Sequence, residues 1–479
     1  MYKELFINIR KKFIDSLEHP LENQTKVLME ILNTNKNCEY GSKYNFSSIK
    51  DIKDFQKNVP ITNYENYKEY IDKIMQGKEN ILTCEKILLL EPTSGSTSAT
   101  KYIPYTQSLK NAFNEGIKPW LSDIFINYPD VIRKPMYWSI TPIQEELKIN
   151  SKVKIGFDSD LEYLDSIFSS IIAKNIIYPS KLPKNTDDFQ KNMANFLSNY
   201  ENLGLISIWN PYLLILFLEK IKDKPEKIWK QIELISCWDE ANAELYAKKL
   251  KEYFPNTKIQ GKGLLATEAI MTIPIENIGK LLCINSHFFE FLDIESNKIK
   301  LINELELGKE YSIIITNQGG LYRYKIGDIV KVYGFYKNFP LLSFIGREHN
   351  TSDYFGEKLN EEFVKTILDK FNIKENSNFH IFCPKKTEKE FFYTLYIDSK
   401  DNINFKELEN EIEKELLANF HYKYARELGQ LQHFKIMKIK NGMKQYLNFC
   451  TKNGQKLGNI KVKNFTSCTN YNFIGEFTV

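Results

Sequence analysis

The sequence predicts an α/β protein: a large N-terminal α/β domain with a β-rich subdomain, followed by a small C-terminal α+β domain. Three observations support this prediction. Short apolar runs alternate with helix-patterned segments between about residues 86 and 260, which is typical of an α/β sheet. Closely spaced strand patterns begin at about Leu281, and a second alternation of helix and strand patterns begins at about Lys358.

The first part of the chain, to about residue 80, has a helical pattern. The segments "TKVLMEILNTN" and "NYENYKEYIDKIMQGK" carry their apolar residues three and four positions apart, so that these residues fall on one face of a helix. Gly77 follows the second segment, where a glycine typically ends a helix. We therefore expect the protein to begin with several amphipathic helices.

The middle of the chain alternates between strands and helices. The expected strands are short, apolar segments: "KILLL", "PMYWSI", "LISIW", "IELISCW" and "TKIQ". The expected helices lie among them: "DDFQKNMANFLSNYEN", "PYLLILFLEKIKDK" and "DEANAELYAKKLKEYF". This alternation predicts buried strands covered by helices.

Two further regions follow. The β-rich region contains five strand patterns: "FFEFLDI", "KIKLI", "YSIIITN", "IVKVYGFY" and "LLSFIG". The last region contains "NEEFVKTILDKFN", "FHIFCP", "EFFYTLYI", "FKELENEIEKELLANFHYKYAREL" and "QHFKIMKI", which predict helix, strand, strand, helix and strand. The polar segment "GREHNTSDYFGEK" separates them, so we place domains at 1–346 and 358–479 and a hinge at 347–357.

Composition excludes several classes of protein. Lys+Arg and Asp+Glu nearly cancel, at 65 and 61, which does not favour a nucleic-acid binder. Seven scattered cysteines show no C-x-x-C spacing, and six histidines show no H-x-x-H spacing, so neither a zinc site nor a disulfide framework is predicted. No apolar run approaches the ~20 residues of a membrane helix. We expect a cytoplasmic protein that binds neither membrane nor nucleic acid and acts as a monomer.

A hydroxyl-rich segment follows the first predicted strand. Six of the eight residues from 93 to 100 are Ser or Thr, around Gly95 and Ala99, and Lys101 comes next. Such a segment offers backbone N–H and side-chain O–H groups to phosphate oxygens, and the lysine adds positive charge. The Walker A pattern is absent. The alternative, a surface Ser/Thr loop without a ligand, is equally compatible with this composition.

The segment "QGKGLLATEA" contains a candidate metal-binding carboxylate. Its Gly261, Gly263 and Ala266 match G-x-G-x-x-A, but no long helix pattern follows, so a dinucleotide fold is not supported. Glu268 lies in an apolar turn, where a Mg²⁺ ion would compensate its burial. A solvated turn is the alternative.

Three later stretches carry charged candidates. In "GGLYRYKIGDIVKVYGF", Asp328 follows a glycine and can accept two ribose hydroxyls, or it is an ordinary turn residue. Arg347 at the proposed boundary is a phosphate or ribose ligand, or a linker residue. Lys461 belongs to a glycine-rich basic stretch, for which a solvated loop is the alternative.

Taken in order, these stretches resemble one known family. "TSGSTSATKYIPYT", "LLATEA", "SHFFEFLDI", "LGKEYSIIITNQGGLYRYKIGDIVKVYGF" and "NGQKLGNIKV" resemble the Gretchen Hagen 3 family of acyl acid amido synthetases. The resemblance runs from about residue 20 to about residue 465, and "GLYRYKIGD" with its flanks is its most specific part. It implies the adenylate-forming superfamily fold, with a mobile C-terminal domain.

The resemblance implies roles for individual residues. ATP-binding positions are Thr93, Ser94, Gly95, Ser96, Thr97, Ser98 and Lys101 for the phosphates, Ala266, Thr267 and Tyr324 around the nucleotide, Asp328 for the ribose, and Arg347. Glu268 matches an acidic position near Mg²⁺ and the α-phosphate, and Lys461 matches a late basic position; both are expected to be catalytic. Asp353 falls at the hinge position.

The resemblance also implies an acyl-binding site, and the sequence departs from the family at several positions. The acyl substrate is expected to contact Trp138, Thr141, Phe157, Trp209 and Asn210. Thr93-Ser94 precede Gly95, and Ser96-Thr97 follow it, where Ser-Ser-Gly-Thr-Ser is usual; Thr267 replaces a serine. The acyl segments do not match those of hormone-conjugating members, so the resemblance does not identify the acid.

The implied reaction forms an amide in two steps. A small carboxylic acid attacks the α-phosphate of ATP, with Mg²⁺ as cofactor, to give an acyl-adenylate and pyrophosphate. An amine, expected to be an amino acid, then displaces AMP. Charge stabilisation by the Thr93–Thr100 segment, by Lys101 and by Mg²⁺ near Glu268 is expected to provide most of the catalysis. Two alternatives stay open: an acid–thiol ligase using coenzyme A or a carrier protein, and a non-catalytic nucleotide-binding relative.

Overall fold

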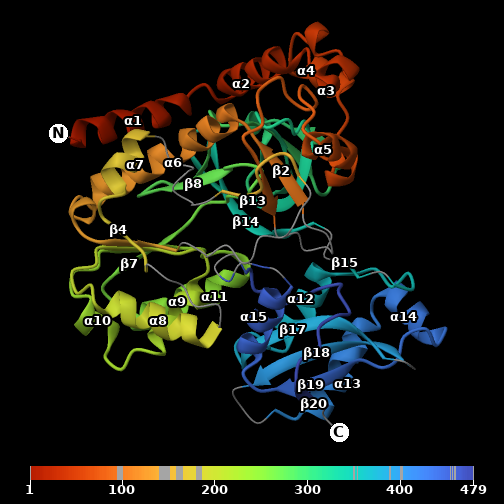
Figure 1. Ribbon diagram of the computed structural model, residues 1–479. Coiled ribbons are helices and arrows are strands. Elements are labelled where there is room, and N and C mark those ends of the chain that lie inside the picture. Colours follow the sequence, from red (N-terminus) through yellow and green to blue (C-terminus); the bar gives the residue numbers. More distant parts are fainter. Residues whose placement is uncertain are drawn as a thin grey trace. The chain divides into compact units, whose positions relative to one another are not determined.

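The computed structural model describes most of the chain. The described residues are 2–93, 101–139, 151–157, 166–179, 186–348, 351–352, 354–387, 390–399, 403–453, 455, 457 and 460–477. The chain folds into two compact units, Met1–Gly346 and Arg347–Val479, and each is described here by itself (Figure 1). The described helices and strands form mixed α/β architecture in both units.

The first unit begins with helices, as the sequence predicts. They are α1 (Lys3–Ser16), α2 (Pro20–Asn35), α3 (Glu39–Lys43), α4 (Ile52–Asn58) and α5 (Lys68–Met75), with 3₁₀ turns at Phe46–Ser48 and Tyr64–Tyr67. Gly77 has φ +81°, a left-handed conformation that glycine adopts without strain. It follows α5, where the sequence predicts a helix stop.

A hairpin and a long helix come next. Strands β1 (Leu89–Thr93) and β2 (Lys101–Tyr105) pair antiparallel. The sequence places this strand earlier, at "KILLL"; the structure begins it at Leu89 and continues it through Glu91 to Thr93, because the backbone groups of these residues find partners in β2. Helix α6 (Gln107–Asn127) follows, capped by Thr106, whose hydroxyl accepts from Leu109 N at 3.0 Å. The pattern analysis missed this helix.

Within the described residues, a five-stranded parallel sheet is formed in the order β4-β3-β5-β6-β7. The strands are β3 (Met136–Trp138), β4 (Ile176–Ile177), β5 (Leu205–Ser207), β6 (Leu234–Cys237) and β7 (Lys258–Gly261). Because β4 lies on one side of β3 and β5 on the other, the winding direction reverses between β3 and β5. In sheets of this kind, ligands bind beyond the carboxyl ends of the strands at such a reversal.

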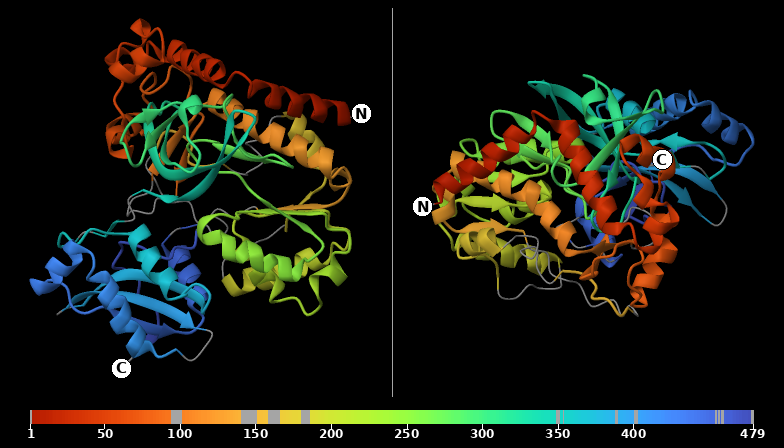
Figure 2. Two further views of the ribbon diagram at one scale, coloured as in Figure 1. Left: turned by 180° about the vertical axis from the view of Figure 1, so that it is seen from behind. Right: turned by 90° about the horizontal axis from the view of Figure 1, so that it is seen from above.

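Helices lie on both sides of this sheet. Helices α8, α9, α10 and α11 lie on one side, and α6 and α7 lie toward the other (Figures 1 and 2). Their bounds are α7 (Ser166–Ile172), α8 (Thr186–Ser198), α9 (Pro211–Leu218), α10 (Pro225–Ile228) and α11 (Glu244–Tyr253). Helix α9 ends at Leu218, six residues before the predicted end, since its apolar run stops there and a charged segment follows.

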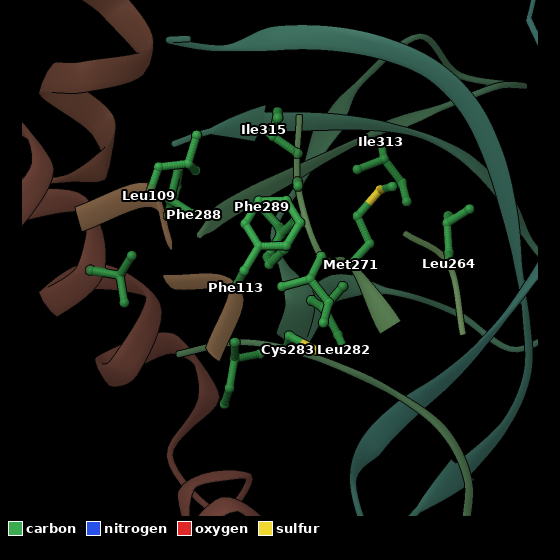
Figure 3. Close-up of a cluster of buried hydrophobic side chains, with 14 of the residues drawn as sticks. Leu109, Phe113, Leu264, Met271, Leu282, Cys283, Phe288, Phe289, Ile313 and Ile315 are labelled. Carbon is green, nitrogen blue, oxygen red and sulfur yellow. The ribbon is translucent and has the colours of Figure 1, made fainter. Parts of the chain in front are cut away.

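A seven-stranded sheet makes up the β-rich region of the first unit, in the order β11-β10-β12-β13-β14-β9-β8. Its described strands are β8 (Thr272–Ile275), β9 (Gly279–Leu282), β10 (Phe288–Asp293), β11 (Ile299–Lys300), β12 (Glu310–Thr316), β13 (Tyr324–Tyr336) and β14 (Phe339–Arg347). Phe288, Phe289, Ile313 and Ile315 of this sheet join Leu109 and Phe113 of α6 in a buried cluster (Figure 3). This core fixes α6 against the sheet.

The second unit is a smaller α+β structure. Its described elements are β15 (Thr351–Ser352), β16 (Leu359–Asn360), α12 (Glu361–Lys370), β17 (Ser377–Lys386), β18 (Phe391–Ser399), α13 (Phe405–Leu416), α14 (Phe420–Glu427), β19 (Lys435–Ile439), α15 (Gly442–Lys452) and β20 (Gly475–Phe477). The single helix predicted over 405–428 is wrong. Asn419 caps a second helix, since its side chain accepts from His421 N and Tyr422 N.

None of the helices among the described residues is long and apolar enough to cross a membrane. All seven cysteines lie in described positions, and all are free thiols.

Candidate active site

The β1–β2 hairpin holds the two ends of the hydroxyl-rich segment together. Thr93 and Lys101 are directly opposite each other in the antiparallel register. Ser94, Gly95, Ser96, Thr97 and Ser98, the positions assigned to phosphate binding, lie outside the described residues. The hairpin therefore defines where the segment starts and returns.

Lys101 lies beside a tyrosine that the sequence analysis did not single out. Its Nζ is 5.6 Å from the centroid of the Tyr64 ring, which is within cation–π range. The Tyr64 hydroxyl accepts from Tyr102 N at 2.7 Å. Burial raises the pKa of Tyr64, and the charge of Glu268 adds to the rise. Tyr64 thus contacts the start of β2 at both Lys101 and Tyr102.

Glu268 lies at the tip of a tight turn. Ala266 N donates to Ala269 O at 2.9 Å, and Ala269 N donates back to Ala266 O at 3.3 Å. Only Thr267 and Glu268 lie between these residues, and the Tyr105 hydroxyl donates to Thr267 O at 2.5 Å. Glu268 is 7% exposed. The turn excludes the helix that a dinucleotide fingerprint requires, as the sequence analysis expected.

Asn317 fixes the Glu268 turn from the other side. Its Nδ2 donates to Glu268 O at 2.7 Å, and its Oδ1 accepts from Gly319 N at 3.0 Å and Leu321 N at 3.1 Å. A Cβ on Gly319 would lie 2.4 Å from Pro104 O, so only glycine permits this approach to β2. Sequence reasoning missed Asn317, although "NQGG" directly after a buried strand marks a tight turn.

A neutral histidine supports the same turn. His287 Nε2 accepts from Ile270 N at 3.3 Å, which leaves the proton on Nδ1, 3.0 Å from the Gln318 Oε1 acceptor. Burial lowers the pKa of His287 to about 4. The ring is therefore uncharged at neutral pH and acts here as a structural link.

Tyr324 and Asp328 lie on β13, close to a bulge. The register with β12 shifts between Ser312 and Ile314, so β13 carries extra residues around Gly327. Gly327 has φ +86°, and Asp328 is 0% exposed. Tyr324 is also buried, and its ring packs edge-on against Tyr67 at 6.0 Å. Bulges of this kind redirect side chains and are common beside active sites.

Arg323, the charged neighbour of these residues, has a structural role. Its Nε and Nη2 donate to the two carboxylate oxygens of Glu290, each at 2.9 Å. Its Nη1 donates to Gln56 O and Val59 O, each at 2.9 Å. All these partners belong to the first unit, so Arg323 connects the N-terminal helices to the seven-stranded sheet.

Two candidates lie at or beyond the unit boundary. Arg347 is partly buried, and Lys461 is exposed. Within the second unit, burial lowers the pKa of Lys463, and the positive charge of Arg347 lowers it further. Lys463, two positions after Lys461, thus interacts electrostatically with Arg347. Asp353 lies outside the described residues.

The expected acyl-site residues fall into two groups. Trp138 ends β3, and Trp209 and Asn210 follow β5, on either side of the point where the sheet reverses. Asn210 also caps α9, accepting from Tyr212 N at 2.9 Å. Phe157 belongs to the hairpin instead: its N donates to Glu91 Oε2 at 2.9 Å, and its ring contacts Tyr105 at 4.9 Å. Thr141 lies outside the described residues.

Sequence reasoning missed a further charged residue of this sheet edge, Lys262. It directly follows β7, and its Nζ donates to Ser207 Oγ at 2.8 Å. The same Nζ is 4.7 Å from the centroids of both the Trp120 and Trp209 rings. Burial lowers the pKa of Lys262 to about 7. The signal was its position between two glycines, Gly261 and Gly263, immediately after a strand.

The described residues suit a magnesium ion held mainly by phosphates. They contain no group of three or more His, Cys, Asp and Glu side chains that could hold a metal by themselves. Mg²⁺ typically binds through one or two carboxylates plus substrate phosphates. Glu268 supplies one carboxylate on the turn that Tyr105 of β2 contacts through Thr267 O, and a single carboxylate completed by substrate phosphates fits that mode of binding.

The sequence matches one family along most of its length. The GH3 family N-terminal domain matches residues 9–227, the GH3 family central domain matches 280–347, and the GH3 family C-terminal domain matches 361–469. The jasmonoyl–L-amino acid synthetase JAR4 of Nicotiana attenuata is 22% identical over 68% of this chain and 69% of that protein. The 4-substituted benzoates–glutamate ligase GH3.12 of Arabidopsis thaliana is 23% identical over 82% of each.

Solved structures share the fold. The acyl acid amido synthetase AtGH3.15 in complex with 2,4-DB superposes with a TM-score of 0.75 at 18% identity, covering 95% of this chain and 94% of that chain. A 2-hydroxyisobutyryl-CoA ligase in the postadenylation state, in complex with R3-HIB-AMP, gives a TM-score of 0.57 at 12% identity, covering 94% and 88%. The predicted fold of adenylate-forming enzymes is confirmed.

Proposed function

The chain belongs to the GH3 family, and from this premise we propose that it is an ATP-dependent acyl acid amido synthetase. The relatives that match most of its length are ligases that join acids to amino acids, such as the jasmonoyl–L-amino acid synthetase. One structural observation carries the proposal beyond the family match: strand β2, which begins at Lys101, contacts the Glu268 turn, because the Tyr105 hydroxyl at its end donates to Thr267 O at 2.5 Å. A phosphate-binding segment and a metal-binding carboxylate need this proximity.

In the first step, a carboxylate oxygen of the acid attacks the α-phosphorus of ATP. The bond to the β-phosphate breaks, and pyrophosphate leaves with both bonding electrons. Lys101 and the backbone N–H groups of residues 93–100 would hold the phosphates in line, which is the main requirement of phosphoryl chemistry. When bound, Mg²⁺ would neutralise phosphate charge beside the Glu268 carboxylate.

In the second step, the amine nitrogen attacks the acyl carbonyl carbon. The mixed anhydride bond breaks, AMP leaves, and the nitrogen loses a proton as the amide forms. Asp328 is assigned to the ribose hydroxyls, and Ala266, Thr267 and Tyr324 to the surroundings of the nucleotide. In the second unit, Arg347 is assigned to the nucleotide and Lys461 to catalysis. We also propose that the second unit moves between the two steps and that the protein is a cytoplasmic monomer.

The decisive experiment is acid-dependent pyrophosphate release from MgATP. Purified protein is assayed with pooled carboxylic acids, with and without pooled amino acids, and AMP is measured in parallel. The proposal expects release that depends on an acid and turnover that rises with amino acids. Glu268→Gln should lower kcat at least about 100-fold, as expected for the loss of a group that stabilises transition-state charge.

The acceptor is tested in the same assay. The fold is shared with a coenzyme A ligase, so coenzyme A is compared with amino acids at equal concentration. Faster turnover with amino acids and a mass-identified amide support the proposal. A thioester product would instead identify an acid–thiol ligase, and absence of pyrophosphate release with every pool would contradict the proposed function.

A further inference from the structure

The most unusual charged group of the first unit is a lysine that lies where a parallel sheet usually binds its ligand. Lys262 directly follows β7, and its N donates to Cys237 O at 2.7 Å, which extends the β6–β7 pairing. Its side chain reaches back to Ser207, at the carboxyl end of β5. That strand flanks the point where the sheet reverses, which is the preferred ligand position in such sheets.

Lys262 is deeply buried without an opposite charge. Its residue exposure is 6%. Among the described residues, its ammonium has one hydrogen-bond acceptor, Ser207 Oγ at 2.8 Å, and forms no ion pair. A buried ammonium normally requires a carboxylate partner, because its desolvation costs several kcal/mol. A single hydroxyl compensates only part of this cost.

The neighbouring carboxylates, Asp239 and Glu240, form ion pairs with Lys280. Lys280 of β9 lies 2.6 Å from Asp239 Oδ1 and 2.8 Å from Glu240 Oε1. A Cβ on Gly261 would lie within 2.0 Å of three Asp239 carboxyl atoms, so this carboxylate packs against the backbone just before Lys262. Two carboxylates thus pair with Lys280, and none of the carboxylates in the described part of the chain pairs with Lys262.

Indole rings line the same sheet edge. Nζ of Lys262 lies 4.7 Å from both the Trp120 and Trp209 rings. Trp120 in turn lies 6.3 Å from Trp138, and Trp209 lies 5.9 Å from Trp238. Within the described structure, the buried Nε1 of Trp138 has no hydrogen-bond partner. The Trp138 N–H lacks an acceptor and the Lys262 ammonium lacks an opposite charge among the described residues. Together they indicate that this sheet edge binds an anionic group.

We propose that Lys262 is a specificity residue of the acyl site, which binds a second acidic group on the carboxylic acid that the enzyme adenylates. This inference rests on the proposed function and adds the substrate class: a dicarboxylic acid, or an acid with an equivalent second anion, whose apolar part lies against the indole rings. The second group keeps its charge through both steps, whereas the reacting carboxylate loses its charge on adenylation. An ion pair with the reacting carboxylate would stabilise the ground state and slow the chemistry.

The test compares matched acids on matched variants. Pyrophosphate release is measured with benzoate against terephthalate and isophthalate, and with hexanoate against adipate. The proteins are wild type, Lys262→Met, Lys262→Arg and the control Lys435→Met. Lys435 is a suitable control because its Nζ also lies over an aromatic ring, 4.3 Å from the Phe392 centroid, but is paired with Glu390 at 2.9 Å.

The expected result is a change in preference rather than a loss of all activity. Wild type should favour the diacid in at least one pair by about 10-fold in kcat/KM. Lys262→Met should remove that preference and leave the monoacid within about twofold, Lys262→Arg should keep part of it, and Lys435→Met should change nothing. Equal diacid-to-monoacid ratios in wild type and Lys262→Met would overturn the inference while leaving the amido synthetase function intact.

A binding measurement decides the matter if no acid supports turnover, the outcome that contradicts the proposed function itself. Four of the five tryptophans, Trp120, Trp138, Trp209 and Trp238, lie at this sheet edge, so intrinsic fluorescence reports on the site. The same acids are titrated into wild type and Lys262→Met. Saturable quenching by a diacid that the variant loses supports the subsite, and identical titrations of both proteins overturn it.

Discussion

Two buried cations of the first unit differ in how their charge is compensated. Arg323 is 5% exposed and donates to both oxygens of Glu290 and to two backbone carbonyls. Lys262 is 6% exposed and has one hydroxyl acceptor and two indole faces. The charge of the first cation is paired with a carboxylate, whereas the second has no carboxylate partner among the described residues.

The difference separates a structural role from a binding role. Arg323 uses four of its five N–H donors inside the protein, and removing such a bidentate guanidinium leaves a buried carboxylate without its charged partner. Lys262 keeps donors that the described residues do not use. Burial alone therefore does not identify a functional cation; the identity of its acceptors does.

The largest expected effect comes from breaking the satisfied pair. Arg323→Met should lower the free energy of unfolding by about 3–5 kcal/mol, because Glu290 would remain charged and buried. Urea unfolding followed by tryptophan fluorescence measures this change. Glu290→Gln should cost a similar amount, and a loss below about 1 kcal/mol in both variants would show that the pair does not hold the N-terminal helices to the sheet.

A smaller effect is expected from Asn317, whose side chain is hydrogen-bonded within the protein and positions the Glu268 turn. Asn317→Ala should destabilise the fold by about 1–3 kcal/mol, since Glu268 O and two backbone N–H groups lose a partner. It should also lower kcat by at least about 10-fold, measured by pyrophosphate release.

Asn35 provides a matched control for that variant. It is equally buried, and its side chain donates to Ile31 O and accepts from Thr83 Oγ1 and Cys84 N. Asn35→Ala should therefore cost similar stability but leave kcat within about twofold. Equal losses of kcat in both variants would mean that Asn317 acts only through stability.

Lys262, the cation without a carboxylate partner among the described residues, should make the free energy of unfolding depend on pH. Burial lowers the pKa of Lys262 from 10.5 to about 7. Between these values, the unfolded chain carries a proton that the folded chain lacks, so the free energy of unfolding rises with pH. The expected slope is about 1.4 kcal/mol per pH unit. Below about pH 7 both states are protonated, and the penalty is constant.

Lys262→Met isolates this slope. The free energy of unfolding of wild type minus that of the variant is measured by urea unfolding at pH 7.5, 8.5 and 9.5, where contributions of all other groups cancel. The difference should increase with pH, and the variant should be at least as stable as wild type at pH 7.5. A difference that does not change with pH would contradict an uncompensated ammonium.

The smallest effect is expected from an exposed pair. Lys73 and Glu39 lie 2.6 Å apart, but their side chains are 33% and 41% exposed, and surface pairs contribute about 0–1 kcal/mol. Lys73→Met should therefore leave the urea midpoint almost unchanged. A cost as large as that of Arg323→Met would remove the distinction between buried and exposed cations on which the comparison depends.

The sequence by itself determined the family, the fold class and most elements. The family matches and the shared fold confirm the predicted amide-forming ligase. Local sequence patterns were sufficient to predict the strands Leu205–Ser207, Leu234–Cys237 and Lys258–Gly261, because the spacing and number of apolar residues are local properties. The missed or misplaced elements have physical causes: Pro119 obscures α6, and Asn419 divides an otherwise continuous amphipathic pattern.

Only the tertiary structure decided which charged residues share a site. Arg323 is adjacent to the candidate Tyr324 in the sequence, but its partner Glu290 lies 33 positions away. Lys262 drew no attention, because Ser207 and Trp120 lie far from it in the sequence. Burial and hydrogen-bond partners arise from contacts between distant segments, and these contacts distinguish a cation that is satisfied by the fold from one that is available to a substrate.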